Sequence, residues 1–367
     1  MSCDAFALAN RGVQGLMPYQ AGKPIQELQR ELGLEHIVKL ASNENPLGPS
    51  KKVLAALQLA SNDIVRYPDS NAFELKRDLA ERLGVSPGQL AMGNGSNDVL
   101  DVIARVFLAQ GKSAVFSQHA FIVYPIAVQA CGARAIVTPA KNWGHDLDAM
   151  AAAVEPDTAL VFVANPNNPT GTSVSAAALI AFLDKIPEQV MVVLDEAYIE
   201  YTEASASTDG VALLKRYPNL IVTRTFSKAW GLAALRVGYS IASPEVTDLL
   251  NRVRAPFNVN SLGLAAAQAV LTDHAYLQEG CETNRRGMQQ LSSGLSALGI
   301  SYIPSAGNFL AAKMPGDAMK IYHQLLQEGI IVRPVGVYDM PDFLRVSIGM
   351  ETENRSFLNA LKKVLNQ

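Results

Sequence analysis

The chain of 367 residues lacks the features that mark several common classes of protein. Its three cysteines, Cys3, Cys131 and Cys281, are odd in number and widely spaced, which excludes a disulfide framework or a cysteine metal site. The five histidines are dispersed and lack the short spacing of zinc ligands. Scattered thiols are typical of a reducing compartment, so we expect a cytoplasmic protein.

Long apolar runs and runs of like charge are also missing. No apolar segment is long enough to span a bilayer, and residues 1–10 lack the pattern of a signal peptide. The net charge is only -3, from 31 basic and 34 acidic residues without a basic block, so nothing indicates nucleic-acid binding. What remains is an ordinary globular composition, 49% hydrophobic and 18% charged, in a chain long enough for two domains.

Short apolar runs alternate with helix-length segments through the middle of the chain. The strand-like runs are Ala114–Phe116, Ala135–Val137, Ala159–Val163, Val190–Leu194, Leu220–Val222 and Ala234–Ile241. This alternation predicts an α/β fold, a mostly parallel sheet flanked by helices. The shorter elements after residue 256 predict a smaller α+β unit, and residues 1–49 are expected to be irregular.

A polar turn follows the run Leu220–Val222 and contains Ser227 and Lys228. Lysine is rarely buried without a partner, so its place at the end of a buried strand needs a reason. Either the ammonium group extends into water, or the amine forms a Schiff base with a carbonyl cofactor. This stretch alone leaves both interpretations open.

Two other strand-like runs end in polar residues. Asp195 ends the run Val190–Leu194 and is followed by Tyr198, and a loop with two prolines and Asn168 follows the run Ala159–Val163. In parallel sheets ligands bind at the carboxyl ends of the strands, so these side chains are candidates for a binding site. An aspartate that merely opens the next loop would fit the pattern as well.

A glycine-rich turn, residues 93–97, leads into an expected helix over residues 99–108. The free N–H groups at a helix N-terminus favour a phosphate, and Ser96 and Asn97 lie at this point. The same residue types also cap helices that bind nothing.

These motifs together carry a resemblance that covers nearly the whole chain. The order Asn165-Pro166-Asn167-Asn168-Pro169-Thr170-Gly171, Asp195-Glu196-Ala197-Tyr198, then Ser227-Lys228 with Gly231, Arg236 and Gly238, resembles fold-type I pyridoxal-phosphate aminotransferases. Three further segments, 41–49, 66–69 and 343–349, resemble the histidinol-phosphate aminotransferases in particular. The resemblance implies a large domain over residues 45–255, and a small domain formed by residues 1–44 with 256–367.

The resemblance implies pyridoxal 5'-phosphate as the cofactor and gives the central residues their roles. Lys228 would form the Schiff base and act as general acid and base. Asp195 would pair with the ring nitrogen and keep it protonated. Asn168 and Tyr198 would bond the phenolic oxygen.

The remaining cofactor contacts follow from the same resemblance. Ser96, Asn97, Ser227 and Arg236 would hold the phosphate, and Phe121 would stack on the ring unless it is an ordinary core residue. Tyr67 would reach the cofactor of a neighbouring subunit in a homodimer, or else pack on its own domain.

The expected reaction is transamination between L-histidinol phosphate and 2-oxoglutarate in histidine biosynthesis. Arg345 would bind either the carboxylate of glutamate or the phosphate of histidinol phosphate, with Arg333 and Tyr19 as helpers; as alternatives, these two are surface residues. An aromatic-amino-acid aminotransferase, a phosphothreonine decarboxylase and a non-catalytic binding protein on the same fold remain as alternatives.

Overall fold

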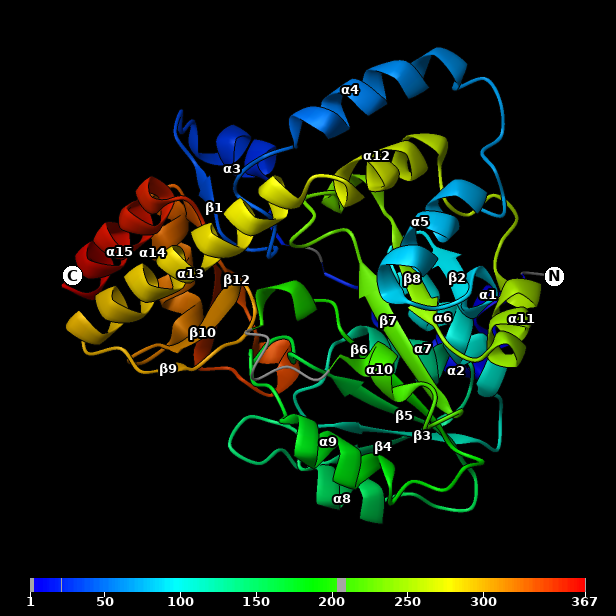
Figure 1. Ribbon diagram of the computed structural model, residues 1–367. Helices are drawn as coiled ribbons and strands as arrows, with labels where there is room; N and C mark the ends of the chain where they lie inside the picture. The colour runs from blue at the N-terminus through cyan, green and yellow to red at the C-terminus, as the bar shows by residue number, and fades with distance from the viewer. Residues whose placement is uncertain (1–2, 21, 203–208, 367) are drawn as a thin grey trace.

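The computed structural model describes residues 3–20, 22–202 and 209–366. Its larger lobe is built on a seven-stranded sheet in the order β2-β8-β7-β6-β5-β3-β4 (Figure 1). The strands are β2 (Leu90–Gly93), β3 (Ser113–Ser117), β4 (Arg134–Thr138), β5 (Thr158–Ala164), β6 (Met191–Asp195), β7 (Leu220–Thr225) and β8 (Gly238–Ile241). Only β8 runs against the others, so the predicted mostly parallel sheet is confirmed.

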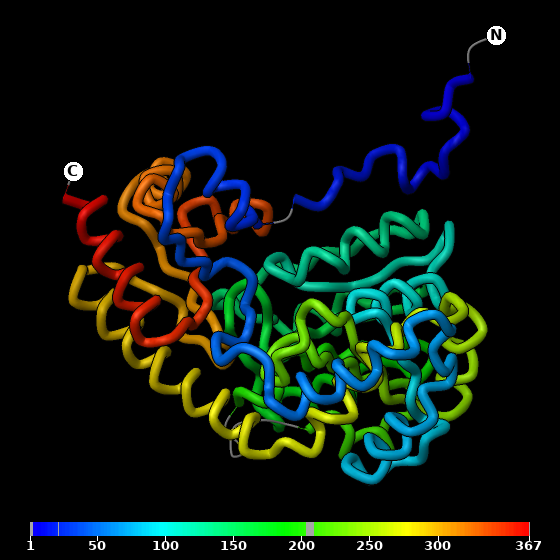
Figure 2. Tube along the Cα trace, turned by 90° about the horizontal axis from the view of Figure 1, so that it is seen from above, coloured from blue at the N-terminus to red at the C-terminus, as the bar shows by residue number. Residues whose placement is uncertain are grey.

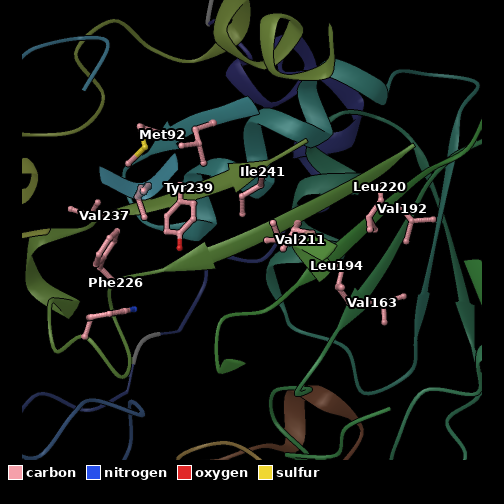
Figure 3. Packing of buried hydrophobic residues seen from close by; sticks show 14 of the residues in the cluster. Met92, Val163, Val192, Leu194, Val211, Leu220, Phe226, Val237, Tyr239 and Ile241 are labelled. Carbon is pink, nitrogen blue, oxygen red and sulfur yellow. The ribbon is translucent and has the colours of Figure 1, made fainter. Parts of the chain in front are cut away.

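Helices cover both faces of this sheet, which explains why the central strands are apolar on both sides. In β5, Val161 and Val163 pack into one apolar cluster and Leu160 and Phe162 into the other. The first cluster, part of which Figure 3 shows, contains residues of α4 (Lys51–Ala60), α5 (Phe73–Leu83), α8 (Leu147–Ala152), α9 (Ala176–Leu183), α10 (Gly210–Leu213) and α12 (Ser261–Leu271). The second contains residues of α6 (Ser96–Phe107), α7 (Val123–Ala130) and α11 (Pro244–Val253).

The smaller lobe has its own sheet, which is antiparallel and has the order β12-β13-β10-β9. Its elements are β9 (Tyr302–Ile303), β10 (Phe309–Lys313), β12 (Arg333–Pro334), β13 (Phe343–Ser347), α13 (His274–Ala297), α14 (Ala318–Gln327) and α15 (Glu351–Leu365). In addition, β1 (Val38–Lys39) pairs in parallel with β11 (Ile330–Ile331), so a segment from the N-terminal part of the chain joins the smaller lobe. The domain limits at residues 45 and 255 stay a prediction. None of the helices in the described ranges is both long and apolar enough to cross a bilayer.

The N-terminal segment is more regular than expected. It forms the helices α1 (Ala5–Leu8), α2 (Arg11–Gln14) and α3 (Ile25–Leu32), and α3 ends at Gly33 with a φ of 68°. Figure 2 shows residues 3–20 as an arm that extends along the outside of the larger lobe. The arm contacts α7, where the Gly12 backbone lies so close to the Gln129 carbonyl that a side chain at residue 12 would overlap it. The helices α1 and α2 have only four residues each, which is too short for a periodicity to be recognised in the sequence.

The strand predicted over residues 234–241 is longer than the strand in the structure. Ala233–Leu235 forms a turn of 3-10 helix, and Arg236 adopts a left-handed conformation with a φ of 59°. Because this conformation cannot continue a strand, β8 begins only at Gly238. The turn has a consequence for the site described below, since it brings the Arg236 side chain back beside Ser227.

Candidate active site

A pocket lies where the parallel strands end. In the sheet, β5, β6 and β7 are neighbours, and the register aligns Ala164 with Asp195 and Asp195 with Thr223. The loops that follow these strands contribute Asn168 and Lys228 to the same pocket wall as Asp195. Strand order thus brings together three groups that are far apart in sequence.

Lys228 is held in this wall by polar and aromatic neighbours. Its Nζ donates to the Ser42 carbonyl over 3.2 Å and lies 5.7 Å from the centre of the Tyr198 ring. Burial, and then the positive charge of Arg345, lowers the pKa of the lysine from 10.5 to about 8. A larger share of neutral amine near neutral pH makes Lys228 a better nucleophile than a surface lysine.

Asp195 lines the pocket and is only 4% exposed. Its Oδ2 accepts from the Tyr124 hydroxyl over 2.8 Å and its Oδ1 from the Thr223 hydroxyl over 3.1 Å. Burial nevertheless raises the pKa of this carboxyl above its ordinary value. A buried carboxylate with neutral donors only is stabilised further by a cation, which a protonated heterocyclic nitrogen would supply.

Asn168 and Tyr198 each keep a donor for a ligand. The Asn168 Oδ1 accepts from Arg345 over 2.6 Å, so the amide NH₂ group remains for other partners. The Tyr198 hydroxyl accepts from Asn43 over 3.0 Å, and its own proton remains to donate. Burial raises the pKa of Tyr198 to about 12, which keeps that proton in place. Two donors at this point suit an anionic oxygen.

The N-terminus of α6 also lines the pocket, and Ser96, Asn97, Ser227 and Arg236 form a group here that we call the anion cradle. The Arg236 Nη1 donates to the Ser227 hydroxyl over 3.2 Å. Gly95 allows this approach, because a Cβ there would overlap the Arg236 guanidinium. Free N–H groups, a hydroxyl and a guanidinium match a phosphate monoester.

The small lobe supplies the outer wall. Arg345 on β13 is 6% exposed, and its Nη2 donates to the Ala41 carbonyl over 2.7 Å. Its buried Nε has no hydrogen-bond partner among the residues that the structure describes, so the guanidinium retains donors. Arg333 also faces the pocket; it donates to the Gln20 carbonyl over 2.6 Å and lies 5.7 Å from the Tyr19 ring centre.

Phe121 lines the pocket and meets the ring of Tyr124 edge to face at 5.9 Å. Tyr67 does not line it: the side chain is 82% exposed and stacks on Phe257 at 4.6 Å. The structure therefore brings together every predicted site residue except Tyr67.

Some pocket residues could not be singled out by their sequence pattern. Tyr338 lines the wall beside Arg333, and nothing in its sequence context distinguishes it from a core residue. Asn43 belongs to the segment 41–49, which carries part of the resemblance, but no role was expected for it; it bonds Tyr198 and also Ser347. An asparagine between Ser42 and Glu44 in a proline- and glycine-rich loop signals a turn, and its φ of 54° agrees.

Comparison of the chain with known proteins first identifies its protein family. Residues 35–361 match the family model described as aminotransferase class I and II. The chain is 59% identical to histidinol-phosphate aminotransferase 2 of Pseudomonas aeruginosa over 99% of both chains. It is 56% identical to histidinol-phosphate aminotransferase 1 of Idiomarina loihiensis over 98% of both.

A solved structure agrees with this result. The crystal structure of histidinol-phosphate aminotransferase from Sinorhizobium meliloti in complex with pyridoxal-5'-phosphate has a TM-score of 0.92 and 32% identity, covering 100% of this chain and 99% of that one. The chain therefore belongs to the class I and II aminotransferases and, within them, to the histidinol-phosphate aminotransferases. The resemblance read from the motifs is confirmed.

Proposed function

We propose that this chain binds pyridoxal 5'-phosphate and catalyses transamination between L-histidinol phosphate and 2-oxoglutarate, with imidazole acetol phosphate and L-glutamate on the other side, in histidine biosynthesis. The observation that carries the proposal is a single pocket in which Lys228, Asp195 and Arg345 meet. Full-length similarity to histidinol-phosphate aminotransferases supports the choice of substrate. A cytoplasmic location stays a prediction from the cysteine pattern.

The residues present fit the different groups of the cofactor. The cradle of Ser96, Asn97, Ser227 and Arg236 suits the phosphate, and its glycine leaves no room for a side chain. Asp195, whose pKa is raised by burial, would be stabilised in its ionised form by a cationic ring nitrogen. Phe121 offers a ring for stacking, and Asn168 and Tyr198 offer donors to an anionic oxygen.

When bound, the cofactor supplies an electron sink for bonds at the substrate Cα. Lys228 would hold it through its amine and, once the substrate amine takes that place, would move a proton to and from the substrate Cα. Asp195 would keep the ring nitrogen protonated. Because both half-reactions would use the same lysine and the same pocket, we expect ping-pong kinetics.

Arg345 would orient both substrates through their anionic groups. A guanidinium binds a carboxylate or a phosphate with two parallel hydrogen bonds. Glutamate offers its α-carboxylate, whereas histidinol phosphate has no carboxylate and offers a phosphate on the neighbouring carbon. Arg333 and Tyr19 also line the pocket and would help Arg345 to bind the phosphate, which is the larger of the two anionic groups.

A titration without amino acceptor tests the function. Histidinol phosphate, phenylalanine and phosphothreonine are added separately to the purified enzyme, and the visible absorption of the cofactor is followed. Conversion at the lowest concentration by histidinol phosphate supports the proposal. Conversion by phenylalanine first indicates an aromatic aminotransferase, and carbon dioxide released from phosphothreonine indicates a decarboxylase. A protein without an absorption band that borohydride removes would be a non-catalytic relative.

Arg345→Lys should reduce kcat/KM for both histidinol phosphate and glutamate by about 10- to 100-fold, because one ammonium group replaces a planar pair of donors. Cofactor binding should persist, since the cradle and Lys228 are unchanged. Arg286→Lys is a control at an exposed arginine outside the pocket, where the side chain is 63% exposed. A loss confined to one of the two substrates would contradict the shared use of Arg345.

We further propose that the enzyme is a homodimer whose subunits share active sites. Large apolar side chains are exposed on α4, on the segment between α4 and α5 and at the start of α5: Leu54, Leu59, Ile64, Val65, Tyr67 and Phe73. An apolar group of this kind is typical of a surface that another protein covers. In such a dimer Tyr67 would reach the cofactor phosphate of the other subunit.

Val65→Asp should weaken this dimer by at least about 100-fold, because an unpaired charge would be buried in the contact. The molecular mass measured by sedimentation should shift toward the monomer, and activity should fall with it. Val137→Asp is the matched control, since Val137 is also exposed but lies on β4. A monomeric wild-type protein with full activity would disprove the shared site.

A further inference from the structure

Tyr124 is a buried polar side chain next to the pocket to which the proposed mechanism gives no role. It lies on α7, is 0% exposed, and its ring stacks on Phe162 at 4.7 Å with planes 13° apart. Within the described residues its hydroxyl has one hydrogen-bond partner, the Oδ2 of Asp195 at 2.8 Å. Packing alone would be served by phenylalanine, and a buried hydroxyl is costly unless it is bonded.

The contact is built into the architecture of the larger lobe. Asp195 is the last residue of β6. Helix α7 packs on the sheet face to which the side chains of Leu160 and Phe162 in β5 point. Thr223, on the neighbouring β7, donates to the other carboxylate oxygen over 3.1 Å. The two hydroxyls thus fix both oxygens of Asp195, which still has lone pairs for a third partner.

The protonation states agree with this geometry. Burial raises the pKa of Asp195, while the hydrogen bonds from Tyr124 and Thr223 and from the Ala197 backbone lower it, as does the charge of Lys228. Burial, and then Asp195, raises the pKa of Tyr124 well above its ordinary value, so Tyr124 remains a donor. Tyr198, another titratable group near this carboxylate, also stays protonated, with a pKa raised to about 12.

We propose that Tyr124 is a positioning residue for Asp195: its hydroxyl holds the carboxylate ionised and turned toward the ring nitrogen of the cofactor, with Thr223 as the second support. The inference rests on the proposed function, in which Asp195 keeps that nitrogen protonated. It gives a reason for a tyrosine at a position that contacts neither substrate nor the reacting atoms.

Tyr124→Phe keeps the stacked ring and removes only the hydroxyl. Because a hydrogen bond to a charged group is lost, we expect the dissociation constant of pyridoxal phosphate from the apoenzyme to rise by about 10-fold, with a similar fall in kcat. The KM of either substrate should change by less than about 2-fold, since Arg345 is untouched. Absorbance titration of apoenzyme with cofactor, together with steady-state kinetics of the holoenzyme, measures these values.

Tyr217→Phe is the matched control. Its hydroxyl also donates to an aspartate, Asp184, over 2.6 Å, but this pair lies outside the pocket. We expect cofactor affinity and kcat to stay at the wild-type values. Thr223→Val removes the second donor with little change of shape, and it should weaken cofactor binding in the same direction as Tyr124→Phe.

A double-mutant cycle decides whether Tyr124 acts through Asp195. In the Asp195→Ala background, Tyr124→Phe should cause no further loss of cofactor affinity. An equal loss in both backgrounds, or unchanged affinity in Tyr124→Phe alone, would overturn the inference. A merely structural role would instead lower the melting temperature of the apoenzyme and leave the cofactor dissociation constant unchanged. A wild-type protein that binds no pyridoxal phosphate would refute the proposed function itself, which is a separate outcome.

Discussion

Replacing Lys228 with alanine should leave a folded protein whose turnover is lower by about 1,000-fold or more, because both the covalent anchor and the general acid–base group are lost. The protein should still bind pyridoxal phosphate through the anion cradle and Asp195. Borohydride treatment followed by mass measurement should find cofactor attached to the wild-type chain and none on the variant. A turnover near the wild-type value would remove Lys228 from its proposed role.

The stability of the apoenzyme provides the control for folding. Because burial lowers the pKa of Lys228 from 10.5 to about 8, its protonated form destabilises the folded state. This cost is fully present below pH 8 and disappears as the pH rises toward 10.5. Lys228→Ala should therefore melt at or above the wild-type temperature near pH 7, with an advantage that shrinks at alkaline pH. A much lower melting temperature would mean that lost turnover reflects lost structure.

Asp195→Asn is the second change with a large expected effect. The amide resembles the carboxylate in shape but carries no charge, so it cannot keep the ring nitrogen protonated, and kcat should fall by about 100-fold or more. The KM of histidinol phosphate should change much less, because Arg345 and Arg333 are unaffected. Steady-state kinetics on cofactor-saturated enzyme measure both quantities.

Asp184→Asn is the matched control for this change. Asp184 also accepts a hydrogen bond from a tyrosine, but its side chain is 46% exposed and lies outside the pocket. This control should retain wild-type kinetics. If Asp195→Asn behaved in the same way, the ring-nitrogen role would be wrong and Asp195 would serve only to hold Tyr124 and Thr223 in place.

Much of the larger lobe follows from local sequence. The apolar runs around Val161, Val193 and Ile221 belong to strands that are buried on both sides, and this composition is typical of strands covered by two helical layers. Parallel strands place their carboxyl ends at one edge, so Asn168, Asp195 and Lys228 had to be neighbours once the strand order was fixed. The α/β class is therefore predictable from residue patterns, whereas the roles of the cofactor residues were expected from the resemblance to a known family.

The path of the chain around the sheet is harder to predict from the sequence. The run over residues 234–241 has the composition of a strand, yet the left-handed conformation of Arg236 divides it. This conformation is stabilised by tertiary contacts, since Arg236 bonds Ser227 and fits only against the bare Gly95. Intrinsic secondary-structure propensities carry no information about such contacts, because the contacts join residues from different elements.

The sequence by itself determined the α/β class and the carboxyl-end location of the site, and its resemblance to a known family predicted the roles of the lysine, aspartate and arginine residues. Only the tertiary structure decided the partners of those residues: Arg345 bonds Asn168 and the Ala41 carbonyl, and Tyr124 bonds Asp195. The physical reason is that side-chain types and short periodicities are local properties, whereas a buried hydrogen bond depends on how strands and helices from distant segments pack. Tyr124 illustrates the difference. By sequence it is one more aromatic residue on an apolar helix, whereas in the fold its hydroxyl donates to the carboxylate of Asp195, which lines the pocket.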